Sequence, residues 1–197
     1  YKMGRTAFPA SACISVNDEV IHGIPGRRKI REGDLVSIDV GACYEGYHGD
    51  SARTFIVGKC SAEAERLVRV TRECFYKGLK EVREGKRVSD ISKAVEQHAQ
   101  SNGYGVVYSY TGHGLGKRLH EEPEVPHVYT GKPGPRLLRG MVICVEPMIN
   151  MGVGEVKMLR DNWTIVTADG SLSSHFEHSI LVTAGEPELL TYVGEDV

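Results

Sequence analysis

Three features are missing from this sequence, and each absence narrows the class of protein. No apolar run approaches the roughly 20 residues that cross a bilayer, and no charged start followed by an apolar stretch resembles a signal peptide. Basic residues number 24 and acidic residues 26, so no excess of one sign indicates nucleic acid or an anionic membrane as a partner. The five cysteines form no Cys-x-x-Cys pair, which favours a reducing cytoplasm.

The length of 197 residues fits one domain, residues 1–197, because domains usually run to roughly 100–200 residues. Apolar positions at three- and four-residue steps predict two helices. One is capped by Ser61 and closed at Gly85, and the other is capped by Ser89 and stopped by Asn102 and Gly103. Short runs rich in β-branched residues predict strands at 12–16, 35–40, 54–57, 106–110, 141–145 and 180–182.

The two halves of the chain carry the same signals in the same order. A His-Gly-aliphatic triplet comes first, a glycine then precedes a strand acid by six residues, and a second acid is followed by a glycine eight residues on. The positions are His22, Gly33, Asp39, Asp50 and Gly58 in the first half, and His113, Gly140, Glu146, Glu177 and Gly185 in the second. This agreement indicates a duplicated unit whose halves face each other across a two-fold-like axis, with a shared site between them.

The acids of these strands need a partner for their charge. Asp39 lies within an apolar run and Glu146 follows one, where an isolated charge costs several kcal/mol to desolvate. One such acid taken alone could pair with an arginine or reach solvent at a strand edge. Four acids in two matching pairs favour a cation, because converging carboxylates repel one another unless positive charge lies among them.

Four carboxylates and the neutral imidazole of His113 bring four negative charges, which two divalent cations would balance. An oxygen-rich set with one nitrogen suits manganese, iron, cobalt or zinc. Two such ions can share a water and lower its pKa toward neutrality, which predicts hydrolysis of an amide or ester. His113 lies in a glycine-rich segment that a substrate can approach closely, and the alternative for it is an ordinary turn histidine.

Two further histidines are candidates for contact with the substrate. His120 follows His113 by seven residues, too far for the helical spacing of a His-Glu-x-x-His zinc motif. It could donate a hydrogen bond to the scissile carbonyl, and His22 could contact the substrate amide from the other side. For both, the alternative is a structural histidine at the surface or in the core. The remaining histidines receive no chemical role and are His48, His98, His127, His175 and His178.

The ordered motifs of the chain resemble those of type I methionine aminopeptidase, which has the pitta-bread fold. They are His22-Gly23-Ile24-Pro25-Gly26, Ile38-Asp39-Val40-Gly41, His48-Gly49-Asp50, Gly112-His113-Gly114-Leu115-Gly116, His120-Glu121-Glu122-Pro123, Glu146-Pro147-Met148 and Glu177-His178-Ser179. Their order and spacing cover nearly the whole chain. The short connection between Glu146 and Glu177 leaves no room for the helical insertion of the type II enzymes.

This resemblance implies an α+β fold in which helices cover a curved, mainly antiparallel sheet with pseudo-two-fold duplication. It implies that Asp50 and Glu177 bridge two divalent metal ions, while Asp39 holds one ion, and His113 with Glu146 holds the other. The implied activity removes the N-terminal methionine from nascent proteins and peptides with a small second residue. Metal-activated water would attack the first peptide bond, and Glu146 would take the proton from that water.

The resemblance also assigns the substrate contacts. His120 would polarise the scissile carbonyl, and His22 would contact the scissile nitrogen. The methionine pocket would be lined by Phe8, Cys13, Leu119 and Trp163. The family often has a larger aromatic residue where Leu119 stands, so the size of the pocket is less firmly predicted than the metal site.

Partners and alternatives follow from the same comparison. The implied partners are the N-termini of nascent polypeptides, with the ribosome as a candidate meeting place, and no membrane or nucleic-acid site. We expect a cytoplasmic monomer. Two other functions fit the same residues: a proline-directed aminopeptidase of the same fold, or a non-catalytic pitta-bread binding module that has lost its metals.

The repeat makes a further prediction about the start of the chain. The second half begins with two helices, whereas the first half begins at the strand of residues 12–16, so its helix pair is missing. The family also carries helical sequence ahead of this point, so we expect the chain to be N-terminally truncated relative to the family and Tyr1 to be an internal residue. The structure should then show an exposed sheet face on the first half, a neighbouring chain covering it, or helices from residues outside this sequence.

Overall fold

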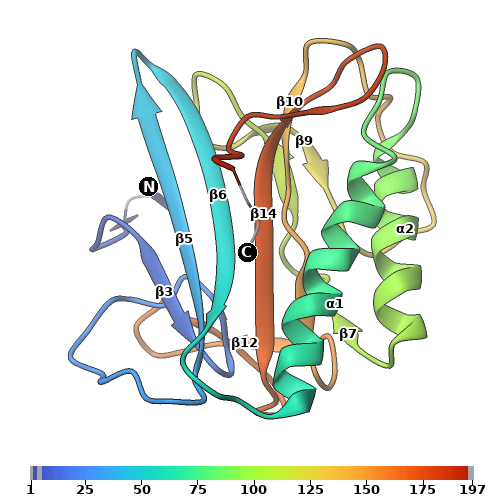
Figure 1. Ribbon diagram of the computed structural model, residues 1–197. Helices are drawn as coiled ribbons and strands as arrows, with labels where there is room; N and C mark the ends of the chain where they lie inside the picture. Colours follow the sequence, from blue (N-terminus) through green and yellow to red (C-terminus); the bar gives the residue numbers. More distant parts are fainter. Residues whose placement is uncertain (1, 4–5, 195–197) are drawn as a thin grey trace.

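The computed structural model describes residues 2–3 and 6–194, and its centre is a ten-stranded sheet with two helices on one side (Figure 1). The elements in chain order are β1 (Lys2–Met3), β2 (Thr6–Ala7), β3 (Cys13–Val16), β4 (Glu19–Ile21), β5 (Leu35–Tyr44), β6 (Tyr47–Ile56), α1 (Ala62–Leu79), α2 (Val88–Ser101), β7 (Gly105–Val106), β8 (Gly112–Gly114), β9 (Glu121–Val125), β10 (Val142–Val145), β11 (Met148–Asn150), β12 (Val156–Met158), β13 (Ile165–Thr167), β14 (Ser173–Leu181) and β15 (Glu188–Leu189). None of the described helices is both long and apolar enough to span a bilayer.

The order of strands across the large sheet confirms the duplication. It runs β3-β5-β6 and then β14-β10-β8, with every neighbouring pair antiparallel, so the second triplet repeats the first in reverse. The two strands that carry Asp39 and lead to Glu146 are also preceded by equivalent turns. Gly33 N–H donates to Val57 O at 2.8 Å with φ at 92°, and Gly140 N–H donates to Val182 O at 2.9 Å with φ at 90°. Both turns need left-handed backbone, which glycine adopts without steric cost.

The hairpin of β5 and β6 is longer than the sequence predicts. The predicted strands stop at residue 40 and start at residue 54, but the ladder continues to a pair between Tyr44 and Tyr47. Glu45 and Gly46 form the two-residue loop with φ of 50° and 83°, the left-handed pair that matches the twist of a hairpin. In contrast, the predicted strand of residues 106–110 is mostly wrong, because β7 ends at Val106 and the chain then turns toward the site.

Helix α1 begins where predicted but ends earlier. The Oγ of Ser61 accepts a hydrogen bond from Ala64 N at 3.2 Å and caps the first turn. The helix ends at Leu79 rather than at Gly85. Gly85 lies in the following turn with φ at 86° and donates its N–H to Leu137 O.

Helix α2 is capped by a different residue from the one predicted. It begins at Val88, so Ser89 lies inside the first turn. Asp90 closes the turn, since its Oδ2 accepts from Arg87 N at 2.9 Å. The predicted stop is confirmed, because Asn102 is the C-cap and Gly103 follows with φ at 81°.

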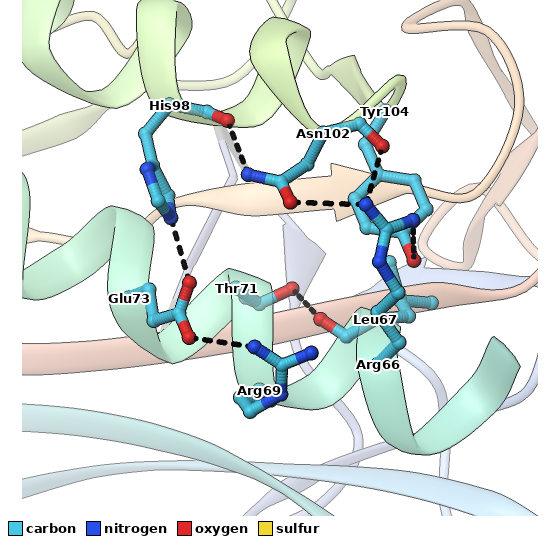
Figure 2. A network of polar contacts seen from close by, with 8 residues as sticks. All are labelled: Arg66, Leu67, Arg69, Thr71, Glu73, His98, Asn102 and Tyr104. Carbon is cyan, nitrogen blue, oxygen red and sulfur yellow. Dashed lines mark hydrogen bonds and ion pairs between the residues drawn. The ribbon is translucent and has the colours of Figure 1, made fainter. Parts of the chain in front are cut away.

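The two helices pack on the second half of the sheet and are tied together by polar contacts. Glu73 of α1 binds His98 Nε2 of α2 at 2.8 Å and Arg69 at 2.9 Å (Figure 2). Two turns before Glu73 on α1, Arg66 donates to the backbone O and side-chain Oδ1 of Asn102. These contacts fix the C-terminal end of α2 against α1, while the apolar face of α1 lies on β14 and β10.

The first half of the sheet has an exposed outer face, which is the first of the three predicted outcomes. Val40 on β5 is 44% exposed and Phe55 on β6 is 48% exposed. The helices of the described residues lie on the second half (Figure 1). The prediction about Tyr1 falls outside the described residues.

Candidate metal centre

The five predicted metal ligands converge where the two halves of the sheet meet. Asp39 comes from β5, Asp50 from β6, His113 from β8 and Glu177 from β14, while Glu146 directly follows β10. The Nε2 of His113 lies 3.5 Å from Glu146 Oε1 and 3.8 Å from Asp50 Oδ2. Ligand atoms of Asp50, His113 and Glu177 lie within 4.8 Å of one another.

Burial and mutual repulsion disfavour the charged form of these carboxylates when no cation is bound. Burial, with the charge of Asp50 beside it, raises the pKa of Asp39 to about 7. Burial raises the pKa of Glu146 and of Glu177 well above the usual range, and the charges of neighbouring acids add to the effect. The Oε1 atoms of both glutamates are buried and have no hydrogen-bond partner among the described residues. An oxygen-rich donor set of this kind fits divalent metal ions.

Neighbouring groups hold the ligands in place. Ser179 Oγ donates to Asp50 O at 2.8 Å and accepts from Asp50 N at 2.9 Å. His113 donates from Nδ1 to Gly114 O at 2.9 Å, which leaves Nε2 free to direct its lone pair at the acids. The imidazole is therefore set as a neutral nitrogen ligand.

His22 and His120 lie on the rim of this centre. Both line a cavity of about 450 Å³ together with the five predicted ligands. The ring of His120 stands edge-on to His113, with centroids 4.3 Å apart. Burial lowers the pKa of His22 and of His120 to about 4, so each ring is neutral near pH 7 and can donate one hydrogen bond.

A second cavity of about 370 Å³ opens beside the centre and shares His22 and His120 with it. Three of the predicted pocket residues line this cavity, namely Phe8, Cys13 and Leu119. Trp163 packs edge-on against Phe8, with ring centroids 5.2 Å apart, and supports it.

The width of this cavity depends on a residue that the sequence analysis did not select. Gly41 also lines it, and a Cβ at Gly41 would lie 3.4 Å from Leu119 Cδ1. A side chain at position 41 would therefore press against Leu119 and narrow the cavity.

Sequence reasoning missed three buried residues at the centre. Cys144 offers its Sγ within 4.8 Å of ligand atoms from the cluster. His175 Nε2 lies 3.9 Å from Glu146 Oε2, and His127 Nε2 accepts the backbone N–H of Glu146 at 3.1 Å. The position of His175 two residues before Glu177 on one strand could have revealed it, because alternate strand residues share a face. No sequence signal brings His127 to Glu146.

Comparisons with known proteins agree with this geometry. The Peptidase_M24 model, described as metallopeptidase family M24, matches residues 1–184. The chain is 50% identical over 190 residues to a methionine aminopeptidase of Clostridium perfringens, covering 96% of this chain and 76% of that one. It is 48% identical over 190 residues to methionine aminopeptidase 1 of Bacillus subtilis, covering 96% and 77%.

Solved structures give the same result. A methionine aminopeptidase from Thermotoga maritima, 45% identical, has a TM-score of 0.90 and is matched over 92% of this chain and 74% of that chain. A prolidase from Pyrococcus furiosus is 23% identical, with a TM-score of 0.76 over 94% of this chain and 50% of that chain. The prolidase therefore shares the fold, while the sequence likeness is to the methionine aminopeptidases.

Proposed function

The chain belongs to metallopeptidase family M24 and to its methionine aminopeptidases, and from this premise we propose that it removes N-terminal methionine from nascent proteins and peptides. The observation that carries the proposal is the buried cluster of carboxylates and one imidazole beside a cavity lined by Phe8, Cys13 and Leu119. These three side chains offer an apolar wall to a methionine side chain, while Asp39 and Asp50 line the same cavity where the first peptide bond would lie.

The chain's own residues would hold two divalent cations. Asp50 and Glu177 would contact both cations, Asp39 would hold one, and His113 with Glu146 would hold the other. When bound, the ions lower the pKa of a water molecule and stabilise negative charge on the scissile oxygen. The Oε1 atoms of Glu146 and Glu177 support this assignment, because they are buried and have no hydrogen-bond partner among the described residues.

Three side chains would then transfer the proton and form hydrogen bonds to the substrate. Glu146 accepts the proton of the attacking water, for which its place in the cavity beside the other four predicted ligands suits it. His120 donates a hydrogen bond to the carbonyl oxygen as negative charge develops there. His22 contacts the scissile nitrogen from the opposite side of the cavity, which both histidines line.

The setting of the reaction belongs to the same proposal. Residues 1–197 form one catalytic domain that works as a monomer in the cytoplasm and meets its substrates at the ribosome. All five cysteines, every one of them within the described residues, are unpaired, which supports a reducing compartment. The two halves contribute strands to one sheet, which supports a single domain.

Metal-dependent release of methionine from short peptides tests the proposed function. Met-Ala-Ser should be cleaved after addition of manganese or cobalt and spared in excess chelator. Met-Trp-Ser should be cleaved far more slowly, because the site is expected to accept only a small second residue. Preference for an Xaa-Pro peptide would identify a proline-directed enzyme, and absence of metal uptake would identify a binding module.

A further inference from the structure

The backbone of Glu146 lies at an interruption in the sheet. Strands β10 and β11 pair with β14 in one continuous register on either side of it. Between them, Phe176 N donates to Pro147 O at 3.4 Å, so the carbonyl of Pro147 faces β14. Because consecutive strand residues direct their polar groups to opposite edges, the N–H of Glu146 points away from β14 and needs another acceptor.

His127 is that acceptor. Its Nε2 receives the N–H of Glu146 at 3.1 Å, and the ring is only 1% exposed. An Nε2 that accepts carries no hydrogen, so the neutral ring holds its proton on Nδ1. Nδ1 is buried without a hydrogen-bond partner among the described residues. An apolar side chain would fill the same space without burying this polar atom, so packing alone does not account for a histidine here.

The chain on either side of His127 is held firmly. Val125, the last residue of β9, is fully buried. Ser92 of α2 donates its hydroxyl to Pro126 O, the carbonyl immediately before His127. The backbone next to His127 is therefore held by α2.

The side chain of Glu146 depends on this support. Its Oε1 lies 3.5 Å from His113 Nε2 and has no hydrogen-bond partner among the described residues. The other oxygen, Oε2, lies 3.9 Å from His175 Nε2. Since no hydrogen bond anchors Oε1 in the metal-free chain, the position of the carboxylate there depends in part on where the backbone of Glu146 is held.

We propose that His127 is a positioning residue for Glu146, which uses its Nε2 to fix the backbone from which this carboxylate reaches the centre. The inference rests on the proposed function, in which Glu146 holds a metal ion and accepts the proton of the attacking water. Outer groups that orient a metal ligand commonly change activity or metal affinity by about 10- to 100-fold when replaced.

Two amide substitutions distinguish the effect of the hydrogen-bond acceptor from the effect of losing the volume of the ring. His127→Gln can place its amide oxygen near the position of Nε2, whereas His127→Asn places it near Nδ1, one bond too short to reach Glu146. We expect the Gln variant to keep kcat within about threefold and the Asn variant to lose about tenfold or more in kcat, with KM little changed. His98→Asn, on α2 and bonded to Glu73, is the matched control and should keep kcat.

Nitrogen NMR of the full wild-type chain gives a readout that does not depend on activity or on the stability of a variant. In the zinc-loaded and metal-free forms, His127 should carry its proton on Nδ1. A scalar coupling across the hydrogen bond should link His127 Nε2 to the amide nitrogen of Glu146.

The outcomes are distinct. An Nε2-protonated or doubly protonated His127 overturns the inference, as do Gln and Asn variants that are equally active or equally impaired. A wild-type chain that shows the coupling but releases no methionine would refute the proposed function and leave the hydrogen bond standing.

Discussion

Ser179 and Asp50 hold each other across the line where β14 meets β6. The hydroxyl of Ser179 both donates to the carbonyl and accepts from the amide of Asp50, at 2.8 and 2.9 Å. One side chain from the second half of the chain therefore fixes both backbone polar groups of an acid from the first half. The junction of β6 and β14, which we call the seam, is therefore stabilised next to the predicted metal ligands.

Replacing this hydroxyl should weaken the fold. Ser179→Ala leaves a buried N–H and a buried carbonyl without their partner, so we expect a loss of about 1–3 kcal/mol in the free energy of unfolding. Urea unfolding of the metal-free protein measures it. Ser51→Ala is the matched control, because it removes a single 3.2 Å bond to Glu177 O from a half-buried position and should cost less. A Ser179→Ala variant as stable as the wild type would contradict this account of the seam.

Neutralising either bridging acid should abolish hydrolysis and weaken metal uptake. In Asp50→Asn and Glu177→Gln an amide replaces a charged oxygen that would touch both cations, and it cannot restore that charge. Calorimetric titration with manganese reports the stoichiometry and affinity. The control is Glu155→Gln, an exposed acid outside the cavity. Full activity with unchanged stoichiometry in either site variant would remove the two-metal hypothesis.

Removing the imidazole of His120 should slow turnover and leave the metals in place. Loss of one positioned donor to a developing oxyanion typically costs roughly 2.7–4 kcal/mol, so His120→Ala should lower kcat by about 10²-fold or more. Metal content by elemental analysis should match the wild type. Loss of metal in this variant would show that His120 is a ligand rather than a donor.

The metal-free protein should become less stable as pH rises from about 6.5 to about 7.5. The pKa of Asp39 is about 7 in the folded chain against an ordinary value of 3.8, and the pKa values of Glu146 and Glu177 are raised in the same direction. Such groups stabilise the fold while they are protonated in it and lose this contribution as pH passes the folded pKa. Each proton involved changes the free energy of unfolding by up to about 1.4 kcal/mol per pH unit.

Buried histidines do not reverse this trend in the chosen window. Burial lowers the pKa of His127 and of His175 to about 3, so their effect on stability falls mainly below pH 6.5 and has the opposite sign. Urea unfolding in excess chelator at the two pH values gives the slope. The metal-loaded protein should lack it, because the cations compensate the charged carboxylates. Stability that rises with pH in the metal-free form would show that the acids are not held protonated.

The parts of the fold that sequence predicts best are those with a local cause. Gly33 and Gly140 precede the strand acids because each turn needs left-handed backbone, so the repeat is visible in the spacing. Ser61 caps α1 for an equally local reason. Where two local signals compete, prediction fails: Asp90 closes the start of α2 rather than its neighbour Ser89.

Contacts between distant segments explain the remaining differences. The length of β5 and β6 depends on cross-strand pairing up to Tyr44 and Tyr47, which composition does not reveal. Spacing alone selects the five predicted ligands, but His127 lies near Glu146 only because β8 pairs with both β10 and β9 in the folded sheet. Its role in the structure depends on that tertiary arrangement.

The reversed strand order has a consequence for how the centre can be assembled. A cut in the connection between β6 and α1 would give one fragment with Asp39 and Asp50 and another with the remaining three predicted ligands. Neither fragment alone would contain all five predicted ligands. Tight cation binding would therefore require that the two fragments associate, and cation affinity would report that association. The ions would then join the two halves of the sheet, and their removal should weaken the junction of β6 and β14 before either half unfolds.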